Sequence, residues 1–275
     1  MNGDYIPPIK RRRTLMSQGF FDYAHAIVRT PGRSVVNGLR KSGRPDPDFE
    51  ALLHEHRAYV ECLTGLGLAV EELPASEAFP DAVFVEDPAL TFAEGAIILK
   101  PGAPSRAGEA DLIAPALERA FERVLRLSGQ GCADGGDVLV LPDKVLIGLS
   151  ARTNAEGALE LITLLAQLGR VGEIAETPGG VLHFKTGCSL IDEESVFALP
   201  QMVDSAAFAG LRVIPVPAGE HGAANKVRVR GAALVAAHYP KSREIIEALG
   251  VTTIALDVRQ IGLIDAGLSC MSLRW

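Results

Sequence analysis

The 275-residue sequence has no uninterrupted apolar run of about 18 residues or more, the length that a membrane-spanning helix needs. Its four cysteines lie far apart and form no Cys-x-x-Cys pair, which argues against both a disulfide framework and a structural zinc site. A formal net charge of −7 argues against general nucleic-acid binding, because that function needs a basic surface. We therefore expect a cytoplasmic protein with free thiols and without a membrane or nucleic-acid partner.

The composition that is present is typical of a folded chain, with 48% hydrophobic and 22% charged residues. The first 22 residues differ, because they contain Pro7-Pro8 and four consecutive basic residues at positions 10–13. No apolar stretch of signal-peptide length follows these basic residues. We expect residues 1–22 to form a flexible N-terminal extension and residues 23–275 to form a single α/β domain.

Short runs rich in Val, Ile and Leu alternate with longer amphipathic stretches along this domain. The expected strands cover residues 25–29, 83–86, 96–99, 138–141, 145–148, 196–199, 211–216, 226–229, 233–236 and 253–256. The expected helices cover residues 49–66, 107–125 and 240–249, and a further helix opens with a capping box at residues 153–156 and runs to about residue 168. Two strands followed by a helix recur three times at intervals of about 45 to 55 residues, with a less regular copy over residues 182–208. Since one such unit cannot bury its own apolar face, we expect the copies to pack around a common centre.

An unusual pair of carboxylates, Glu86 and Asp87, follows the apolar residues of the expected strand 83–86. Successive strand residues point to opposite faces, so the two side chains cannot both lie on one apolar face. We expect at least one of them to point into a cleft or to pair with a cation. The alternative is an aspartate that only makes a turn before Pro88.

Three further positions carry side chains that are able to do chemistry. Asp134 begins the run Asp-Gly-Gly-Asp, whose glycines allow a tight turn or a close approach of the backbone to a ligand; a plain hairpin is the alternative. His183 lies between apolar residues and glycines, where a buried structural histidine is the alternative to a catalytic one. Cys270 follows a glycine-containing turn in an apolar segment, which is compatible with an inert thiol or with a thiol at the rim of a cleft.

The order and wording of these segments together resemble the dimethylarginine dimethylaminohydrolase family. The matching segments cover residues 79–88, 100–106, 134–139, 150–157, 182–187, 223–225 and 264–273. This family belongs to the guanidino-group-modifying superfamily, alongside arginine deiminase and the amidinotransferases. The resemblance covers residues 23–275 and implies the pentein fold, a five-bladed α/β propeller of ββαβ units, which would account for the repeat.

Carried over residue by residue, the resemblance implies that Cys270 is the nucleophile, His183 the general acid and base, and Asp134 the third catalytic residue. The implied reaction hydrolyses Nω-methylated arginine to citrulline and a methylamine through a covalent S-alkylthiouronium intermediate. The implied substrate-binding residues are Asp87, Glu86, Asp81, Arg152, Lys100, Leu39, Ile264 and Asp265. No metal or organic cofactor is implied, and family members of this size are often homodimers.

One position departs from the family pattern. Lys100 stands where a second carboxylate-binding arginine is usual, and lysine keeps the charge but loses the planar two-pronged geometry. Alternatives to methylarginine hydrolysis are an arginine deiminase-like or other guanidino-acid hydrolase, a non-catalytic arginine-binding protein, and a structural α/β protein. Release of ammonia rather than dimethylamine would indicate the first of these.

Overall fold

The computed structural model describes residues 19–275, and residues 1–18 of the expected N-terminal extension lie outside this description. Phe21, near the end of the expected extension, is buried, and its carbonyl oxygen accepts a hydrogen bond of 2.6 Å from the Arg230 amide. The folded body therefore includes residues of the expected extension. Among the described residues, no helix combines the length and the apolarity that crossing a membrane demands.

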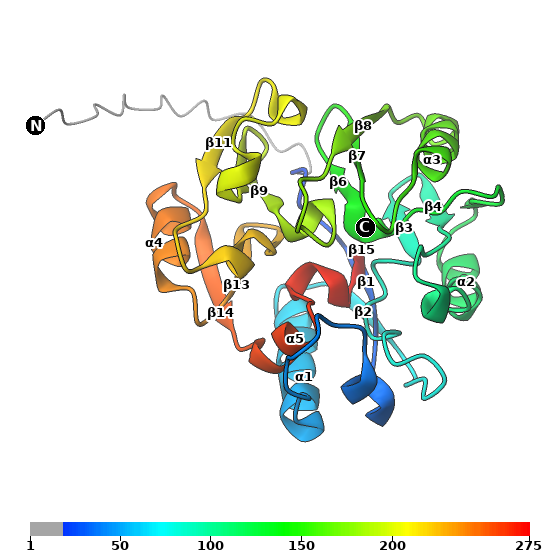
Figure 1. The fold of residues 1–275 in the computed structure, drawn as a ribbon, viewed down its shortest axis with the longest axis horizontal. Helices are drawn as coiled ribbons and strands as arrows, with labels where there is room; N and C mark the ends of the chain where they lie inside the picture. Colours follow the sequence, from blue (N-terminus) through cyan, green and yellow to red (C-terminus); the bar gives the residue numbers. More distant parts are fainter. Residues whose placement is uncertain (1–18) are drawn as a thin grey trace, which may run out of the picture.

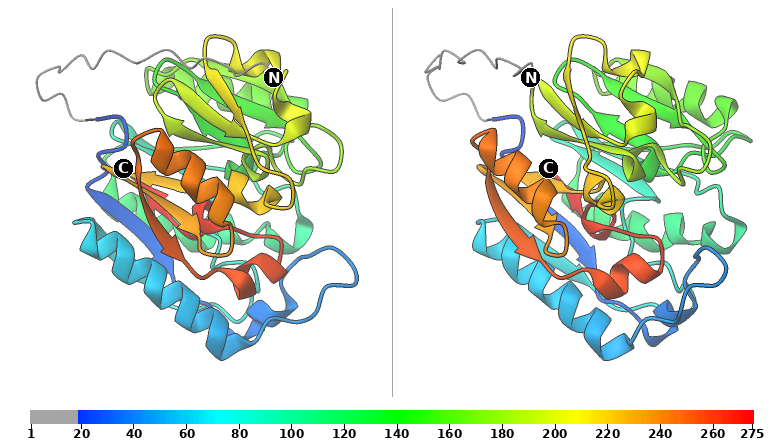
Figure 2. Two further views of the ribbon diagram at one scale, coloured as in Figure 1. Left: turned by 90° about the vertical axis from the view of Figure 1, so that its left-hand side faces the viewer. Right: turned by 60° about the vertical axis from the view of Figure 1, so that its left-hand side comes forward.

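Within residues 19–275 the strands form five three-stranded sheets arranged around a central axis (Figure 1). The sheets are β15 (Leu273–Arg274), β1 (His25–Arg29) and β2 (Ala69–Leu73); β3 (Ala89–Phe92), β4 (Gly95–Ile98) and β5 (Val124–Arg126); β6 (Val138–Val140), β7 (Val145–Leu149) and β8 (Gly172–Glu176); β9 (Cys188–Asp192), β10 (Ser195–Ala198) and β11 (Arg212–Pro215); and β12 (Val227–Val229), β13 (Ala232–Ala236) and β14 (Thr252–Leu256). The α-helices are α1 (Phe49–Gly65), α2 (Glu109–Ala120), α3 (Ala155–Gln167), α4 (Pro240–Ala248) and α5 (Arg259–Leu263). The side views show α1 and α4 on the outside of the sheets (Figure 2).

Each sheet is built from the same ββαβ unit. Two consecutive strands pair antiparallel, a helix follows, and the next strand pairs parallel to the second, as in β6, β7, α3 and β8. In the unit of β9 to β11, two 3₁₀ turns (Pro200–Met202 and Ala206–Phe208) replace the α-helix. The last unit joins the two ends of the described chain, because β15 pairs with β1 through Ala26 opposite Arg274 and Ile27 opposite Leu273. The expected five-bladed propeller is thus confirmed, and its ring is closed by the segment that carries Cys270.

Local signals account for the ends of the outer helices. Asp48 begins α1 by accepting a hydrogen bond of 2.7 Å from the Ala51 amide. Pro240 occupies the first turn of α4, where the missing amide donor costs nothing. Gly169 and Gly250 follow α3 and α4 with φ of 75° and 83°, a left-handed conformation that favours glycine.

The prediction of a strand at residues 83–86 is wrong. This segment forms successive turns, in which the amides of Ala82 and Phe84 donate to the carbonyl oxygens of Phe79 and Asp81 at 3.0 and 2.9 Å. Its apolar side chains are buried all the same, and a short apolar run does not by itself distinguish a strand from a buried turn. The unit begins instead at β3, so the acidic residues 86 and 87 lie on a loop that leads into the sheet.

The helix expected at residues 107–125 is shorter than its apolar pattern suggested. It ends at Ala120, Phe121 is extended with φ of −130°, and Val124–Arg126 form the outer strand β5. The pattern failed because the apolar residues of β5 continue the spacing of the helix.

Candidate active site

Four of the predicted site residues lie in turns that precede the first strand of different propeller units. Asp87 precedes β3, Asp134 precedes β6, His183 precedes β9 and Cys270 precedes β15. Ligand atoms of Asp87, Asp134 and His183 lie within 4.8 Å of one another, and Cys270 lines the same cavity as Asp87 and His183. The propeller therefore gathers residues that are up to 183 positions apart (270 − 87) at one site.

The imidazole of His183 is held by Asp134. Its Nε2 lies 3.0 Å from Oδ2 of Asp134, whose other oxygen accepts a hydrogen bond of 2.7 Å from the Gly102 amide. Asp134 has no exposed surface, and its own amide donates to Oγ1 of Thr153 at 3.0 Å. The Gly102 amide and the Thr153 hydroxyl thus hold Asp134 in place, and Asp134 in turn holds the imidazole.

The carboxylate of Asp87 is held by a buried arginine, Arg106, which was not predicted as a site residue from the sequence. Arg106 forms an ion pair with Oδ2 of Asp87, and its Nε and Nη2 bind Glu109 at 3.0 and 2.6 Å. Oδ1 of Asp87 accepts from the Gly136 amide at 3.2 Å. A side chain at position 136 would meet both Asp87 and His183 at 2.8 Å, so glycine is required there.

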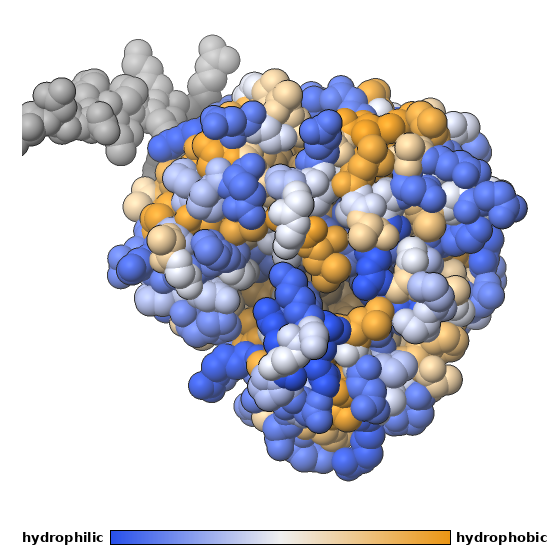
Figure 3. Space-filling view, viewed as in Figure 1, coloured by the Kyte–Doolittle hydropathy of each residue, from blue (hydrophilic) through white to orange (hydrophobic). Residues whose placement is uncertain are grey.

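These groups face a cavity of about 240 Å³. It is lined by Leu39, Arg40, Lys41, Asp81, Phe84, Asp87, Arg106, Arg152, Leu182, His183, Ile264, Asp265, Ala266 and Cys270. The face of the molecule seen in Figure 3 is hollowed near its centre, with polar residues crossing the hollow. The carboxylates Asp81, Asp87 and Asp265 with the cations Arg106 and Arg152 make this a site suited to a ligand that carries both charges.

The loop over the cavity is tied to its rim by acidic side chains. Oδ1 of Asp81 accepts from the Leu39 amide at 2.9 Å, and Oδ2 of Asp265 accepts from the Lys41 amide at 2.6 Å. Asp265 also forms an ion pair of 3.1 Å with Arg44 and adopts a left-handed conformation with φ of 56°. These contacts hold the backbone of residues 39–44 against the ligand space.

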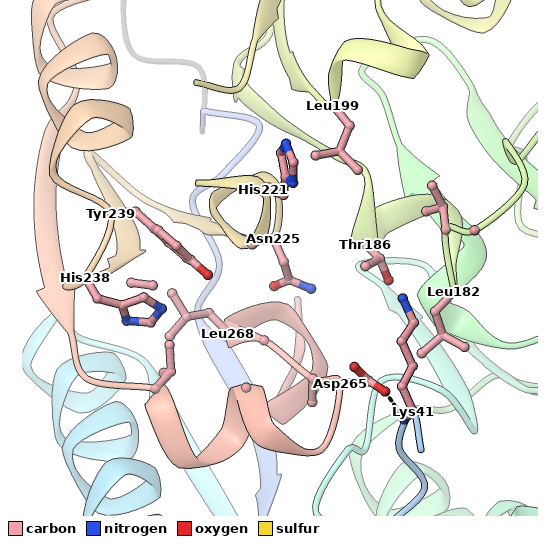
Figure 4. Close-up of a pocket in the computed structure, with 18 of the residues that line it drawn as sticks. Lys41, Leu182, Thr186, Leu199, His221, Asn225, His238, Tyr239, Asp265 and Leu268 are labelled. Atoms are coloured by element: carbon pink, nitrogen blue, oxygen red, sulfur yellow. Dashed lines mark hydrogen bonds between the residues drawn. The ribbon is translucent and has the colours of Figure 1, made fainter. Parts of the chain in front are cut away.

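A second and larger cavity, of about 490 Å³, adjoins the first (Figure 4). The two share the lining residues Lys41, Leu182, Asp265 and Ala266. Asn225, Tyr239 and two imidazoles, His221 and His238, line only the larger cavity.

Two of the predicted substrate-binding residues do not line the smaller cavity. The ammonium of Lys100 donates to the Gly129 carbonyl at 2.9 Å, because the backbone of Lys100 pairs with Ala133 and directs the side chain away. Arg106, six residues further on, lines the cavity instead. Glu86 faces away from it, with its carboxylate 2.7 Å from Nζ of Lys185 and 2.9 Å from the Ser269 hydroxyl.

Asp137 is a further positioning residue, which was not predicted from the sequence. This fully buried carboxylate accepts hydrogen bonds from the Ser150 and Thr153 hydroxyls at 2.6 and 2.7 Å and from the Phe184 amide at 2.8 Å. It thereby joins the turn of Asp134 to the loops that carry Arg152 and His183. The repeated aspartate at the end of the Asp-Gly-Gly-Asp run was the available signal.

The site residues have shifted pKa values whose causes are visible in the structure. Burial together with the charges of Glu86 and Asp87 raises the pKa of the Cys270 thiol to about 12. Burial alone would lower the pKa of His183, but Asp87 and the hydrogen bond with Asp134 outweigh it and raise the pKa to about 9. Burial opposes ionisation of Asp87, yet the ion pair with Arg106 prevails and holds its pKa below the ordinary value. At neutral pH the resting site therefore contains a neutral thiol, an imidazolium and a carboxylate.

Asp87, Asp134 and His183 are also the described group whose spacing would suit a metal ion. A metal ion would have to compete with Arg106 for Asp87 and with His183 for Asp134, whereas an N–H donor can use a second lone pair on the same carboxylate oxygens. A cavity in which Asp87 and His183 lie beside a thiol and the cations Arg106 and Arg152 is better matched to an organic ligand than to a metal with a complete ligand set.

Comparison with known proteins places the chain in a family. A family model described as arginine deiminase matches residues 75–230. N(G),N(G)-dimethylarginine dimethylaminohydrolase of Pseudomonas aeruginosa is 39% identical over 92% of this chain and 100% of its own length, and the enzyme of that name from Streptomyces coelicolor is 32% identical over 90% and 96%.

Solved structures give the same result. The P. aeruginosa enzyme, as a cysteine-to-serine variant complexed with citrulline, superposes with a TM-score of 0.90 over 93% of this chain and 100% of that chain. The N-terminal domain of ArgZ, an arginine dihydrolase, is only 14% identical but has a TM-score of 0.81 over 91% of this chain and 97% of that chain, which shows the shared fold. The chain belongs to the dimethylarginine dimethylaminohydrolase family, within the superfamily that includes arginine deiminase.

Proposed function

We propose that this protein hydrolyses Nω-methylated arginine to citrulline and a methylamine. The observation that carries the proposal is the convergence of a thiol (Cys270), an imidazole (His183) and a carboxylate (Asp87) from three propeller units on one small cavity, with the buried carboxylate of Asp134, from a fourth unit, bound to that imidazole. Family membership supports the guanidino carbon as the reacting centre, and the relative from P. aeruginosa binds citrulline in its cysteine-to-serine variant.

The charges of the cavity suit the two ends of such a substrate. The guanidinium would lie between Asp87 and Asp134, which can accept hydrogen bonds from its planar N–H groups and fix it in front of Cys270. Arg152, which forms no ion pair among residues 19–275, is available for the α-carboxylate. Backbone groups of Leu39, Ile264 and Asp265, and the carboxylate of Asp81, are placed to hold the α-amino group.

The chemistry follows from these positions. The bound cation stabilises the Cys270 thiolate, whose sulfur attacks the guanidinium carbon to give a tetrahedral adduct. The C–N bond to the methylated nitrogen breaks as His183 protonates the departing amine, which leaves an S-alkylthiouronium on Cys270. His183 then accepts a proton from water as its oxygen attacks the same carbon. The C–S bond breaks as the remaining hydroxyl proton passes to solvent, and citrulline and the thiolate are released.

The protonation states predict an alkaline rise in activity. The resting site contains a thiol and an imidazolium and so holds one proton more than the reactive thiolate–imidazolium pair. We expect this extra proton to be lost with a pKa near that of His183, about 9. We expect kcat/KM to fall by about tenfold per unit as the pH drops below this value, because kcat/KM reports ionisation of the free enzyme. A pH profile of kcat/KM checks this; a profile that is flat from about pH 6 to about pH 9 would contradict it.

Arg152 and Lys100 can be separated by substitution. Arg152→Ala is expected to raise KM by about 10- to 100-fold with a smaller change in kcat, because it removes a charged hydrogen bond to the non-reacting end of the substrate. Lys100→Ala is the matched control and is expected to leave KM within about twofold, since its ammonium binds the Gly129 carbonyl outside the cavity. Steady-state kinetics with methylarginine measure both; a large KM effect of Lys100→Ala would restore it to the site.

The substrate assignment is tested with purified protein and three amino acids: asymmetric dimethylarginine, monomethylarginine and arginine. We expect citrulline from the two methylated compounds, together with dimethylamine and methylamine in equal amounts to citrulline. Citrulline and ammonia from arginine alone would instead indicate an arginine deiminase-like hydrolase.

We further infer a cytoplasmic location, supported by the four unpaired cysteines. We also infer a homodimer, supported only by the fact that family members of this size are often homodimers. Light scattering coupled to size exclusion measures the second directly. A monomeric mass would remove the dimer from the proposal without affecting the chemistry.

A further inference from the structure

Each of the five propeller units has a segment that leads into its first strand, and four of these segments hold the site residues described above. In each unit one side chain precedes the first strand, as Asp87, Asp134, His183 and Cys270 do for β3, β6, β9 and β15. The remaining unit begins at β12, and the residue two positions before it is Asn225. Asn225 is therefore a polar residue in the fifth of these segments, and no step of the proposed reaction uses it.

Asn225 contacts the sulfur of Cys270. Its Nδ2 donates to Sγ at 3.7 Å, and its Oδ1 accepts from the Ser269 amide at 2.9 Å. The second contact determines the orientation of the amide group, because only the oxygen can accept from an N–H, which leaves the NH₂ to face the sulfur. Figure 4 shows the amide directed toward the turn that carries Leu268, next to the larger cavity.

The surrounding backbone is shaped for this contact. Any side chain at Gly267 would meet Cγ of Asn225 at 2.5 Å, so the close approach of the two segments requires glycine. Asn225 itself ends a 3₁₀ turn (His221–Ala224), and its amide donates to the Gly222 carbonyl at 3.2 Å. The donor is thus held in place on both sides.

We propose that Asn225 is a further catalytic residue, which stabilises the thiolate of Cys270 by hydrogen bonding to its sulfur. The sulfur lies in a buried region among carboxylates, where an N–H dipole aimed at it favours the charged form. This inference deepens the proposed function, since the thiolate is the nucleophile of that reaction. The same donor is also placed to bind the sulfur when it departs from the thiouronium carbon.

Two substitutions separate donation to the sulfur from support of the loop. Asn225→Asp keeps the oxygen that anchors the Ser269 amide but replaces the donor by a charged acceptor. Asn225→Ala keeps neutrality but loses the anchor. Loss of the donor is the only change that the two variants share.

The measurement is the rate at which neutral iodoacetamide alkylates Cys270 near pH 9 without substrate, read from the peptide mass. We expect both variants to react about tenfold or more slowly, the effect of losing one hydrogen bond to a charged group. We also expect kcat/KM for dimethylarginine to fall by at least the same factor. Because alkylation needs no substrate, it tests the role of Asn225 even if methylarginine hydrolysis fails its own assay.

The chain contains a matched control. Nδ2 of Asn154 lies 3.7 Å from Sγ of Cys132, and Oδ1 of Asn154 accepts from the Gly157 amide at 2.9 Å to cap α3. Asn154→Asp conserves the cap, since aspartate serves equally well there, and is expected to leave Cys270 alkylation unchanged. A wild-type alkylation rate in either Asn225 variant would overturn the proposal. If only Asn225→Asp slowed alkylation, its added negative charge would explain the effect. If only Asn225→Ala slowed it, loss of the loop anchor would explain it.

Discussion

Replacement of Cys270 by serine is expected to lower kcat by about 10⁴-fold or more while the protein still binds its substrate. A hydroxyl is a far weaker acid than a thiol, and the burial and carboxylates that together raise the pKa of the thiol to about 12 would oppose an alkoxide as well. The substitution removes no large apolar group, so the fold should be unaffected. Steady-state assays give kcat, and calorimetry with methylarginine gives the retained affinity.

Cys62→Ser is the matched control, because this half-buried thiol lies on the outer helix α1, away from the cavity. It should retain wild-type kcat. Intact mass spectrometry of wild-type protein quenched during turnover should show a covalent adduct that Cys270→Ser lacks. Turnover by Cys270→Ser within tenfold of wild type would refute the nucleophile assignment.

The second large effect is expected for His183→Gln, with a loss of about 10²- to 10⁴-fold in kcat. Glutamine can keep a hydrogen bond to Asp134 but transfers no proton, so both protonation of the leaving amine and activation of water fail. The break in kcat/KM near pH 9 should be lost with the imidazole, and kcat/KM should keep rising up to about pH 10, because the nucleophile must then lose a thiol proton whose pKa is about 12. The kinetic profile of the variant from about pH 6 to about pH 10 measures both effects.

A substrate analogue with a thiol in place of the amine leaving group gives a sharper test of His183. A thiolate leaves without a proton, so His183→Gln should still form the thiouronium on Cys270 and then stall for want of an activated water. Protein mass after mixing should show a stable adduct. His238→Gln, whose imidazole lines only the larger cavity, is the control and should turn over normally. Release of citrulline at the wild-type rate by His183→Gln would exclude its role as general base.

The ends of the outer helices are determined largely by contacts between residues close in sequence. Asp48, Pro240 and Gly250 mark the ends of α1 and α4 by contacts within a few residues, and these ends were predictable. Three outer strands, β2, β5 and β8, were not predicted at all. Each is at least partly exposed and carries at least one charged residue, and they are strands because the neighbouring strand in each sheet offers a parallel partner.

The residues of the candidate site also divide into those that were predicted from the sequence and those that only the structure identified. Cys270, His183 and Asp134 were predicted by position, because each lies in a segment whose wording is distinctive, and the structure brings all three to one centre. Lys100 and Arg106 were not distinguishable by charge or by segment. Pairing of Lys100 with Ala133 turns one cation outward, and a 3₁₀ turn (Pro104–Arg106) directs the other to Asp87.

The sequence by itself determined the repeated unit, the ends of most helices and the identity of the reactive groups, since these depend on residue type and on contacts within one unit. Tertiary structure alone decided which polar groups share the centre. Closure of the ring by β15 on β1 brings Cys270 beside Asn225 and Asp87, and the burial that results sets their protonation. The reason is physical: hydrogen bonds between turns of different units and the removal of water from the axis exist only when all five sheets are assembled.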